Sequence, residues 1–357
     1  MSDRVRRRLR LARWLGPWTA SDRAPDDVTC TSIDVAGERP FEAWLLRPRD
    51  RRPRGALLVV PGLHYAGPAD PRFDRFVRVL ASSGLAVLAP FLPDYRAMTL
   101  EPRVLADTDR ALDALLAAEP SLRPGVFSIS FGSMPALRLA AARSSELSGL
   151  VVFGGFADFR RALRFALGTD GERVNDPLNA PVVFLNLLPF LDVADAHREP
   201  LARALRHYCE RTWGREDHKR PEVYGPVAAA IARELPEAVR ELFLVACRAR
   251  PGTTTRAERA LERSGAAFDW IDPRPHLSAI RCPVTLVHGR DDDVIPYEES
   301  LDLERALAPH TRVRTLLTGL YGHTKNEAGA LSEGPLVLWR ELSTMVGILD
   351  AIARTAG

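Results

Sequence analysis

The chain has 357 residues, of which 46% are hydrophobic and 27% charged, a balance typical of a globular protein and not of a disordered or membrane-spanning one. Its formal net charge of +3 is small for this length and gives no argument for a nucleic-acid partner. The four cysteines have no paired spacing, which favours reduced thiols and a cytoplasmic location.

Residues 1–27 precede the first predicted strand and begin with a basic segment. Six arginines alternate with leucine and tryptophan over residues 1–18. A twin-arginine export signal is not expected, because Arg10 and Arg13 interrupt the apolar run that such a signal needs. We expect a short amphipathic helix packed on its own domain, with weak peripheral contact to an anionic membrane as the alternative.

The next part of the chain alternates between strand and helix patterns. Apolar residues recur at every second position over 28–35 and 41–47, which predicts an antiparallel hairpin. From Gly55 onward the apolar runs are continuous, as in strands that are buried on both faces. Segments with a helical period of 3.6 separate these runs, so we expect a parallel sheet with right-handed crossovers. The predicted inner strands are 56–60, 85–89, the strand before Ser130, and 150–153.

This alternation stops after Gly155 and resumes near residue 283. We therefore divide the folded chain into an α/β core of residues 28–155 and 277–357 and a helical cap inserted at residues 156–276. The second part of the core is predicted to contain, in order, strand 283–289, helix 297–307, strand 313–317 and a final helix.

One segment of the cap, residues 181–193, is apolar nearly throughout. It is far shorter than the roughly 20 residues that span a bilayer. We expect it to be a buried helix or a lining of the cap. An apolar lining above an active site would favour a hydrophobic acyl substrate.

The core is organised around residues 126–140, with the sequence VFSISFGSMPALRLA. A short apolar strand turns sharply at Ser130 into an amphipathic helix, which is the layout of a nucleophile elbow. Ser128 and Gly132 supply the small residues that this tight turn needs, although the usual G-x-S-x-G pattern has a glycine at the first position. A structural role of Ser130 as a helix N-cap would give the same local pattern, so the catalytic interpretation depends on its partners.

A serine nucleophile needs a base and a carboxylate that orients the base, and at a nucleophile elbow these follow in the order serine, acid, histidine. Residues 282–296 (CPVTLVHGRDDDVIP) provide a buried strand, a turn at Gly289 and three aspartates. Counting from the glycine, Asp292 occupies the third position, where we expect the catalytic carboxylate.

Other interpretations of the acid remain open. Asp291 and Asp293 are neighbouring candidates, and Asp158, just after strand 150–153, is an alternative from another loop. The non-catalytic interpretation is a solvated acidic loop or a cation site with His288, although three consecutive aspartates seldom converge on one metal.

The base is predicted at His323, which follows Gly322 in the loop after the last strand (TGLYGHTKNE, residues 318–327). The other seven histidines lack such a setting. His207, Cys209 and His218 match no zinc-ligand spacing, so no metal is expected.

The oxyanion hole needs two backbone N–H groups aimed at one point. Phe131 is expected to supply one of them. The other is expected from the turn at residues 61–68 (PGLHYAGP), from Leu63 or, as second choice, His64, with Gly62 allowing close backbone approach. His64 and Tyr65 are candidate substrate-binding residues.

With the elbow, the HGRDDDVIP loop and the YGH segment in this order, the chain resembles the α/β-hydrolase superfamily, in its serine esterase and lipase branch. The resemblance covers residues 28–155 and 277–355. It implies an α/β fold with a mostly parallel central sheet flanked by helices and a helical cap between the sixth and seventh strands. The sequence departs from the family at Ser128 and at PGLH, which replaces a His-Gly oxyanion turn.

The resemblance implies hydrolysis of a small-molecule carboxylic ester without a cofactor. His323 would take the proton of Ser130, Asp292 would orient the imidazolium, and activity would fall as the pH drops through the titration of His323. A serine at this position argues against the aspartate nucleophile of dehalogenases and epoxide hydrolases. The alternatives are a non-catalytic ligand-binding protein of this fold and a same-fold thioesterase or lyase. The sequence leaves the oligomeric state open.

Overall fold

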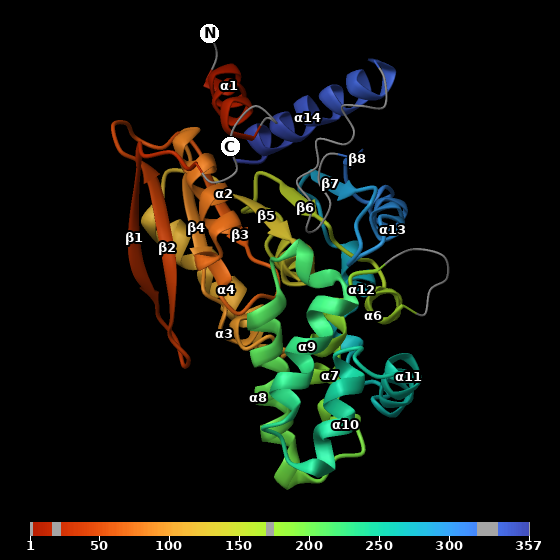
Figure 1. The fold of residues 1–357 in the computed structure, drawn as a ribbon. Helices are drawn as coiled ribbons and strands as arrows, with labels where there is room; N and C mark the ends of the chain where they lie inside the picture. The colour runs from red at the N-terminus through yellow and green to blue at the C-terminus, as the bar shows by residue number, and fades with distance from the viewer. Residues whose placement is uncertain (1–2, 16–22, 169–174, 320–334, 357) are drawn as a thin grey trace.

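The computed structural model describes residues 3–15, 23–168, 175–319 and 335–356. An eight-stranded sheet has the order β1-β2-β4-β3-β5-β6-β7-β8 (Figure 1). The pairs β1–β2 and β2–β4 are antiparallel and all the others are parallel, so the predicted mostly parallel α/β sheet is confirmed. The strands are β1 (Val28–Val35), β2 (Phe41–Pro48), β3 (Ala56–Val60), β4 (Ala86–Pro90), β5 (Gly125–Ile129), β6 (Leu150–Phe153), β7 (Val284–Gly289) and β8 (Val313–Thr318).

The position of each strand in the sheet follows from its hydrophobic pattern. The central strand β3 is buried at every position, and its residues alternate between the two faces of the sheet. Leu57 and Val59 join one apolar core, whereas Leu58 and Val60 join the other. β1 lies at the edge, and its interior positions are mostly exposed.

Helices cover both faces of the sheet. The core that contains Leu57 is formed with α2 (Pro71–Ser82), α14 (Pro335–Thr355) and the N-terminal α1 (Asp3–Leu15). The core that contains Leu58 is formed with the helices of the opposite face and extends into the segment between β6 and β7. The helices of that opposite face are α3 (Pro93–Arg96), α4 (Arg103–Ala118), α5 (Ser133–Ala142) and α13 (Glu298–Leu307).

The described part of the chain between β6 and β7 is mostly helical, and Figure 1 shows most of its helices at the end of the molecule opposite α1 and α14. Of the apolar segment 181–193, predicted as a buried helix or a lining, the first part lies in α7, where Asn186 is the only residue that is not buried. The segment continues into the short 3-10 helix η4 (Leu188–Phe190), where Pro189 is exposed. The helices of this insertion are α6 (Phe159–Leu167), α7 (Ala180–Leu187), α8 (Asp195–Thr212), α9 (Pro221–Ala232), α10 (Glu237–Ala246), α11 (Thr253–Arg263) and α12 (Arg274–Leu277).

The N-terminal helix α1 packs on α14 and α2, as expected for a helix that belongs to its own domain. Leu11 is completely buried, and the guanidinium of Arg7 donates to the carbonyl oxygens of Ala353 at 2.8 Å and Arg54 at 3.1 Å. In the part of the chain that the structure describes, no helix has both the length and the apolar character needed to cross a bilayer.

Candidate active site

Ser130 lies where the carboxyl end of β5 turns into the short 3-10 helix η2 (Ser130–Gly132), which leads directly into α5. Its backbone φ is +53°, in the left-handed region that non-glycine residues rarely adopt. Such strain persists only where the surrounding structure enforces it, and it is characteristic of a nucleophile elbow. The residue is 7% exposed and lines a cavity of about 290 Å³.

The small residues around Ser130 have a steric reason. A Cβ atom on Gly132 would lie 2.7 Å from the carbonyl oxygen of Val60, and one on Gly62 would lie 3.3 Å from the Cβ of Ser130. The β3 turn and the elbow therefore touch through backbone. Ser128, which replaces the usual glycine, is fully buried, and its hydroxyl donates to the carbonyl oxygen of Val151 at 3.4 Å. The departure from the family pattern is thus accommodated by β6.

The cavity at Ser130 has walls from five parts of the chain. The turn after β3 contributes Leu63 and His64, α2 contributes Phe73 and Phe76, and the elbow contributes Phe131. The rest of the wall comes from the acid loop (Val294) and from the insertion, whose lining residues include Asp176, Leu178, Asn179, Val182, Trp213, Arg215 and Lys219.

A second, smaller cavity of about 40 Å³ lies beside the first. The two share five lining residues: Leu63, Phe131, Asn179, Val182 and Val294. The other walls of the small cavity are mostly apolar and come from α6 and α7. Leu63 and Phe131, the predicted oxyanion donors, therefore lie where a large cavity of mixed polarity meets a small apolar one.

His64 and Tyr65 differ in their relation to the cavity. His64 lines it, with Nδ1 accepting the backbone N–H of Ala66 at 3.2 Å and Nε2 3.6 Å from the carboxylate of Asp70. Burial lowers the pKa of His64 and the carboxylate of Asp70 opposes this effect, so burial favours the neutral ring. Tyr65 does not line the cavity. Its ring stacks on His64 at a centroid distance of 4.4 Å, and its hydroxyl donates to the carbonyl oxygen of Glu210 at 3.5 Å.

Asp292 lies in the loop after β7 and is 6% exposed. Its Oδ1 accepts the backbone N–H groups of Val294 and Ile295, both at 2.9 Å. Its Oδ2 lies 3.4 Å from Nε2 of His288, a fully buried ring that also contacts Ser300 and the carbonyl oxygen of Ile295. The Asp292 carboxylate is therefore held in a fixed orientation by its own loop.

The other three candidate acids have different surroundings. Asp291 is exposed, and Asp293 is paired with Lys219. Asp158 is the N-cap of α6, where it accepts the N–H of Arg161 at 3.1 Å and lies 3.2 Å from the guanidinium of Arg274. Among the described residues, no group of three or more His, Cys, Asp or Glu side chains is placed to hold a metal ion.

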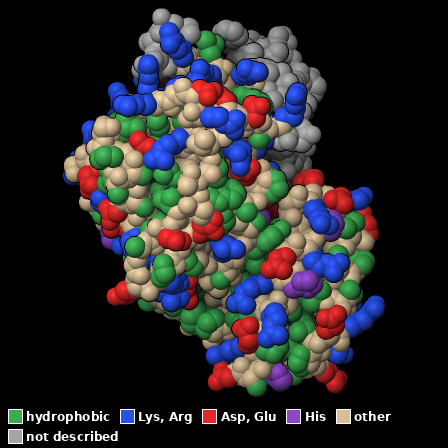
Figure 2. Space-filling model, turned by 90° about the vertical axis from the view of Figure 1, so that its left-hand side faces the viewer, with side chains coloured by type: hydrophobic (Ala, Val, Ile, Leu, Met, Phe, Trp, Pro, Cys, Tyr) green, Lys and Arg blue, Asp and Glu red, His purple; other side chains and the backbone are tan. Residues whose placement is uncertain are grey.

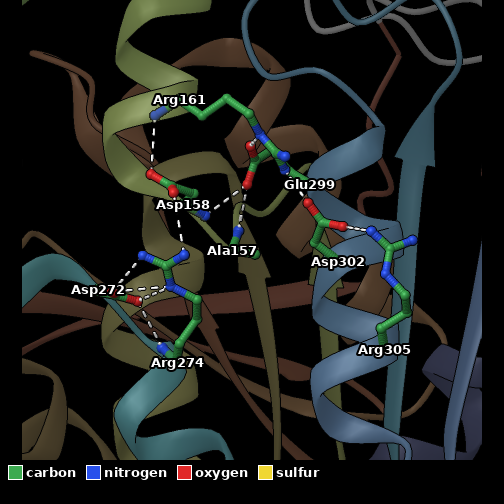
Figure 3. A network of polar contacts seen from close by, with 8 residues as sticks. All are labelled: Ala157, Asp158, Arg161, Asp272, Arg274, Glu299, Asp302 and Arg305. Atoms are coloured by element: carbon green, nitrogen blue, oxygen red, sulfur yellow. Dashed lines mark hydrogen bonds and ion pairs between the residues drawn. The ribbon is translucent and has the colours of Figure 1, made fainter.

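A polar network around the buried Glu299 of α13 connects the two ends of the insertion (Figure 3). Glu299 is fully buried and accepts the N–H groups of Ala157 at 2.8 Å and Asp158 at 2.7 Å, where the chain leaves β6. It also pairs with Arg161 of α6. At the other end of the insertion, Arg274 pairs with Asp158. The crossing after β6 is thus fixed to α13, and the crossing before β7 is tied to it through Asp158.

A second ionic cluster connects the insertion to the acid loop itself. The ammonium of Lys219 pairs with Asp293 and lies 3.3 Å from the carboxylates of both Asp176 and Glu216. The N–H of Asp176 donates to the carbonyl oxygen of Asp293 at 2.8 Å. Burial raises the pKa of Asp176, and Lys219 opposes this rise. No motif in the sequence predicts this cluster. The only signal is that 47 of the 49 basic residues are arginine and just two, one of them Lys219, are lysine.

Replacing Lys219 with methionine should therefore weaken the position of the acid loop. The carboxylates of Asp176 and Asp293 would face each other without this cation, at a cost of about 1–3 kcal/mol in the free energy of unfolding. We expect turnover at this site to fall about tenfold, because Asp292 is adjacent to the displaced residue.

Chemical denaturation and steady-state kinetics would measure both effects. Lys219→Arg should restore only part of them, since the planar guanidinium cannot direct three donors as a compact ammonium does. Arg203→Met is the matched control, because Arg203 is 75% exposed on α8. Wild-type stability and turnover in the Lys219→Met protein would disprove the role of this cluster.

His323, the predicted base, lies outside the described residues. The structure brings Ser130, Phe131, Leu63 and His64 to one cavity. Asp292 does not line this cavity, but it accepts the N–H of Val294, which does.

Comparisons with known proteins identify solved structures of similar fold, but no protein of similar sequence. No protein-family model matches the chain, and no curated protein matches its sequence. Among solved structures, an esterase of Pyrococcus furiosus aligns with a TM-score of 0.51 at 13% identity, over 96% of this chain and 97% of the esterase.

An acylaminoacyl peptidase of Pyrococcus horikoshii also aligns with a TM-score of 0.51, at 12% identity. The alignment includes 93% of this chain but spans only 42% of the peptidase. Both proteins belong to the superfamily that the sequence resembles. At these identities the likeness establishes the architecture, and the chemistry has to be argued from the site.

Proposed function

The chain has the α/β-hydrolase fold, and we propose that it is a serine hydrolase that cleaves a carboxylic ester through an acyl-enzyme. The observation that carries this proposal is the backbone of Ser130, held at a φ of +53° between β5 and α5 with its side chain at a cavity. A serine that only capped a helix would have extended backbone dihedrals and would not need this strain.

In the proposed mechanism, His323 takes the proton of Ser130 as the serine oxygen attacks the ester carbonyl, and Asp292 orients the resulting imidazolium. The N–H groups of Phe131 and Leu63 stabilise the oxyanion. The carbonyl oxygen of Phe131 accepts the hydroxyl of Tyr95 at 2.9 Å, which supports a fixed orientation of the elbow backbone. The intermediate then collapses as the bond to the alcohol breaks, and the imidazolium of His323 gives its proton to the departing alcohol. His323 next takes a proton from water as the water attacks the acyl-enzyme, and the second collapse releases the carboxylic acid and returns a proton to Ser130. The chemistry needs neither a metal nor an organic cofactor.

The two cavities support a small ester with one short apolar arm. The 40 Å³ cavity has room for about three water-sized groups, whereas the 290 Å³ cavity can hold a larger substituent. Because they meet at Leu63 and Phe131, the carbonyl would lie between them. We therefore expect hydrolysis of nitrophenyl esters to be fastest for acyl chains of up to about four carbons.

A fluorophosphonate probe tests the proposal directly, because only an activated serine reacts quickly. Mass spectrometry of the labelled protein should find the probe on Ser130. A panel of nitrophenyl esters and acyl thioesters of matched chain length would then separate an esterase from a thioesterase or lyase. A protein that binds a hydrophobic ligand while leaving the probe unreacted would be the non-catalytic alternative.

A further inference from the structure

The outer surface of α1 is unusual for this molecule. Within the described ranges, only three large hydrophobic side chains are exposed: Val5 (40%) and Leu9 (58%) on α1, and Val346 (58%) on α14. These two helices pack against each other. Val5 and Leu9 are one helical turn apart and share one side of α1, whereas Arg7 and Leu11 on the other side are buried. Large apolar side chains are thus exposed at one end of the protein.

Positive charge surrounds these apolar residues. Arg6 and Arg10 are exposed on the same side of α1, and neither has an ion pair with a described acidic residue. Arg10 also lies close enough to Arg51, in the loop after β2, to add to the lowering of the pKa of Arg51 that burial mainly causes. Figure 2 shows Lys and Arg side chains gathered at the top of the molecule, the end where Figure 1 places α1.

We propose that this surface, the α1 face (Val5, Arg6, Leu9 and Arg10), docks on an anionic lipid membrane. A membrane accommodates both features, because arginines bind acidic headgroups while leucine and valine enter the boundary with the acyl chains. A second copy of the chain fits poorly, since a two-fold contact would bring the same arginines together. A nucleic acid would use the arginines but would leave Val5 and Leu9 in water.

The direction of the strands shows how the protein would lie on the membrane. The backbone N–H of Ala56, at the start of β3, donates to the carbonyl oxygen of Ala356 at 3.1 Å, so the end of the chain lies at the amino ends of the strands. Arg7 of α1 contacts the carbonyl oxygen of Arg54 there as well. Ser130 lies at the opposite, carboxyl end of β5. The α1 face and the cavity are thus at opposite ends of the sheet, and the docked protein would take its substrate from water.

Vesicle co-sedimentation tests the proposal. The full chain should bind vesicles of phosphatidylcholine with added phosphatidylserine, should not bind phosphatidylcholine alone, and should lose binding as salt is added. The double variant Arg6→Glu and Arg10→Glu should bind at least about thirtyfold more weakly. Leu9→Asn should weaken binding about tenfold without a change in charge, and it serves as the second test if the double variant does not fold.

The matched control reverses the same number of charges elsewhere. Arg203 and Arg211 are exposed on α8 of the insertion, and their double change to glutamate should leave vesicle binding unchanged. Equal binding by the Arg6/Arg10 variant, or equal loss in the control, would overturn the proposal. If the protein binds duplex DNA and the Leu9→Asn variant retains that binding, the partner is a nucleic acid. If the protein forms a dimer that Leu9→Asn dissociates, the partner is a second copy of the chain. Either result would overturn the membrane proposal. Labelling of Ser130 by the fluorophosphonate probe does not depend on vesicle binding. The proposed function can therefore fail or hold separately from the membrane proposal.

Discussion

Replacing Ser130 with alanine should lower kcat for ester hydrolysis by about three or more orders of magnitude. The variant loses the oxygen that we propose forms the acyl-enzyme, while the proposed oxyanion donors at Phe131 and Leu63 and the cavity remain. Some acceleration over water can therefore persist, but no covalent intermediate can form. The rate with a short-chain nitrophenyl ester, and the absence of fluorophosphonate labelling, would measure the loss.

The fold should tolerate this change. Ser130 is a small residue whose side chain borders a cavity, and alanine removes only the hydroxyl. We expect the free energy of unfolding to change by less than about 1 kcal/mol. Ser32→Ala, on the exposed face of β1, is the control for loss of a hydroxyl. Near-normal turnover by a folded Ser130→Ala protein would reject Ser130 as the nucleophile.

The sequence predicted the sheet well because the hydrophobic pattern of each strand indicates which of its faces are buried. The continuous apolar run of β3 requires burial on both faces, and the helical period between strands requires crossovers. The elbow was also predictable, since a tight strand-to-helix turn needs small residues within a few positions of the serine. These constraints act between residues that are close in the chain, so they can be recognised in one sequence.

Contacts between distant segments could not be predicted in this way. Lys219 and Asp293 are 74 residues apart, and Arg161 and Glu299 are 138 apart, so no spacing rule connects them. It was also not possible to predict which of two neighbouring residues in one turn would face the cavity. His64 and Tyr65 were both predicted to bind substrate. Of the two, His64 lines the cavity, whereas the ring of Tyr65 stacks on the His64 ring.

Asp292→Asn should lower kcat by about three to four orders of magnitude. The asparagine can keep its oxygen toward the N–H groups of Val294 and Ile295, so the loop should retain its shape. Its other group would then be an amide donor where the carboxylate had been. A donor there cannot stabilise an imidazolium and favours the wrong tautomer of the base. Steady-state kinetics and a thermal unfolding curve would separate this effect from loss of fold.

The control for this prediction is Asp158→Asn, the alternative acid. Asparagine caps a helix about as well as aspartate, so α6 should begin normally and the ion pair with Arg274 is the main loss. That pair is half exposed on the arginine side, and we expect turnover to stay within about threefold of the wild type. The opposite pattern, with a large loss at Asp158 and little change at Asp292, would assign the catalytic carboxylate to the loop after β6. Both variants make the same chemical change, from carboxylate to amide, so only the position differs.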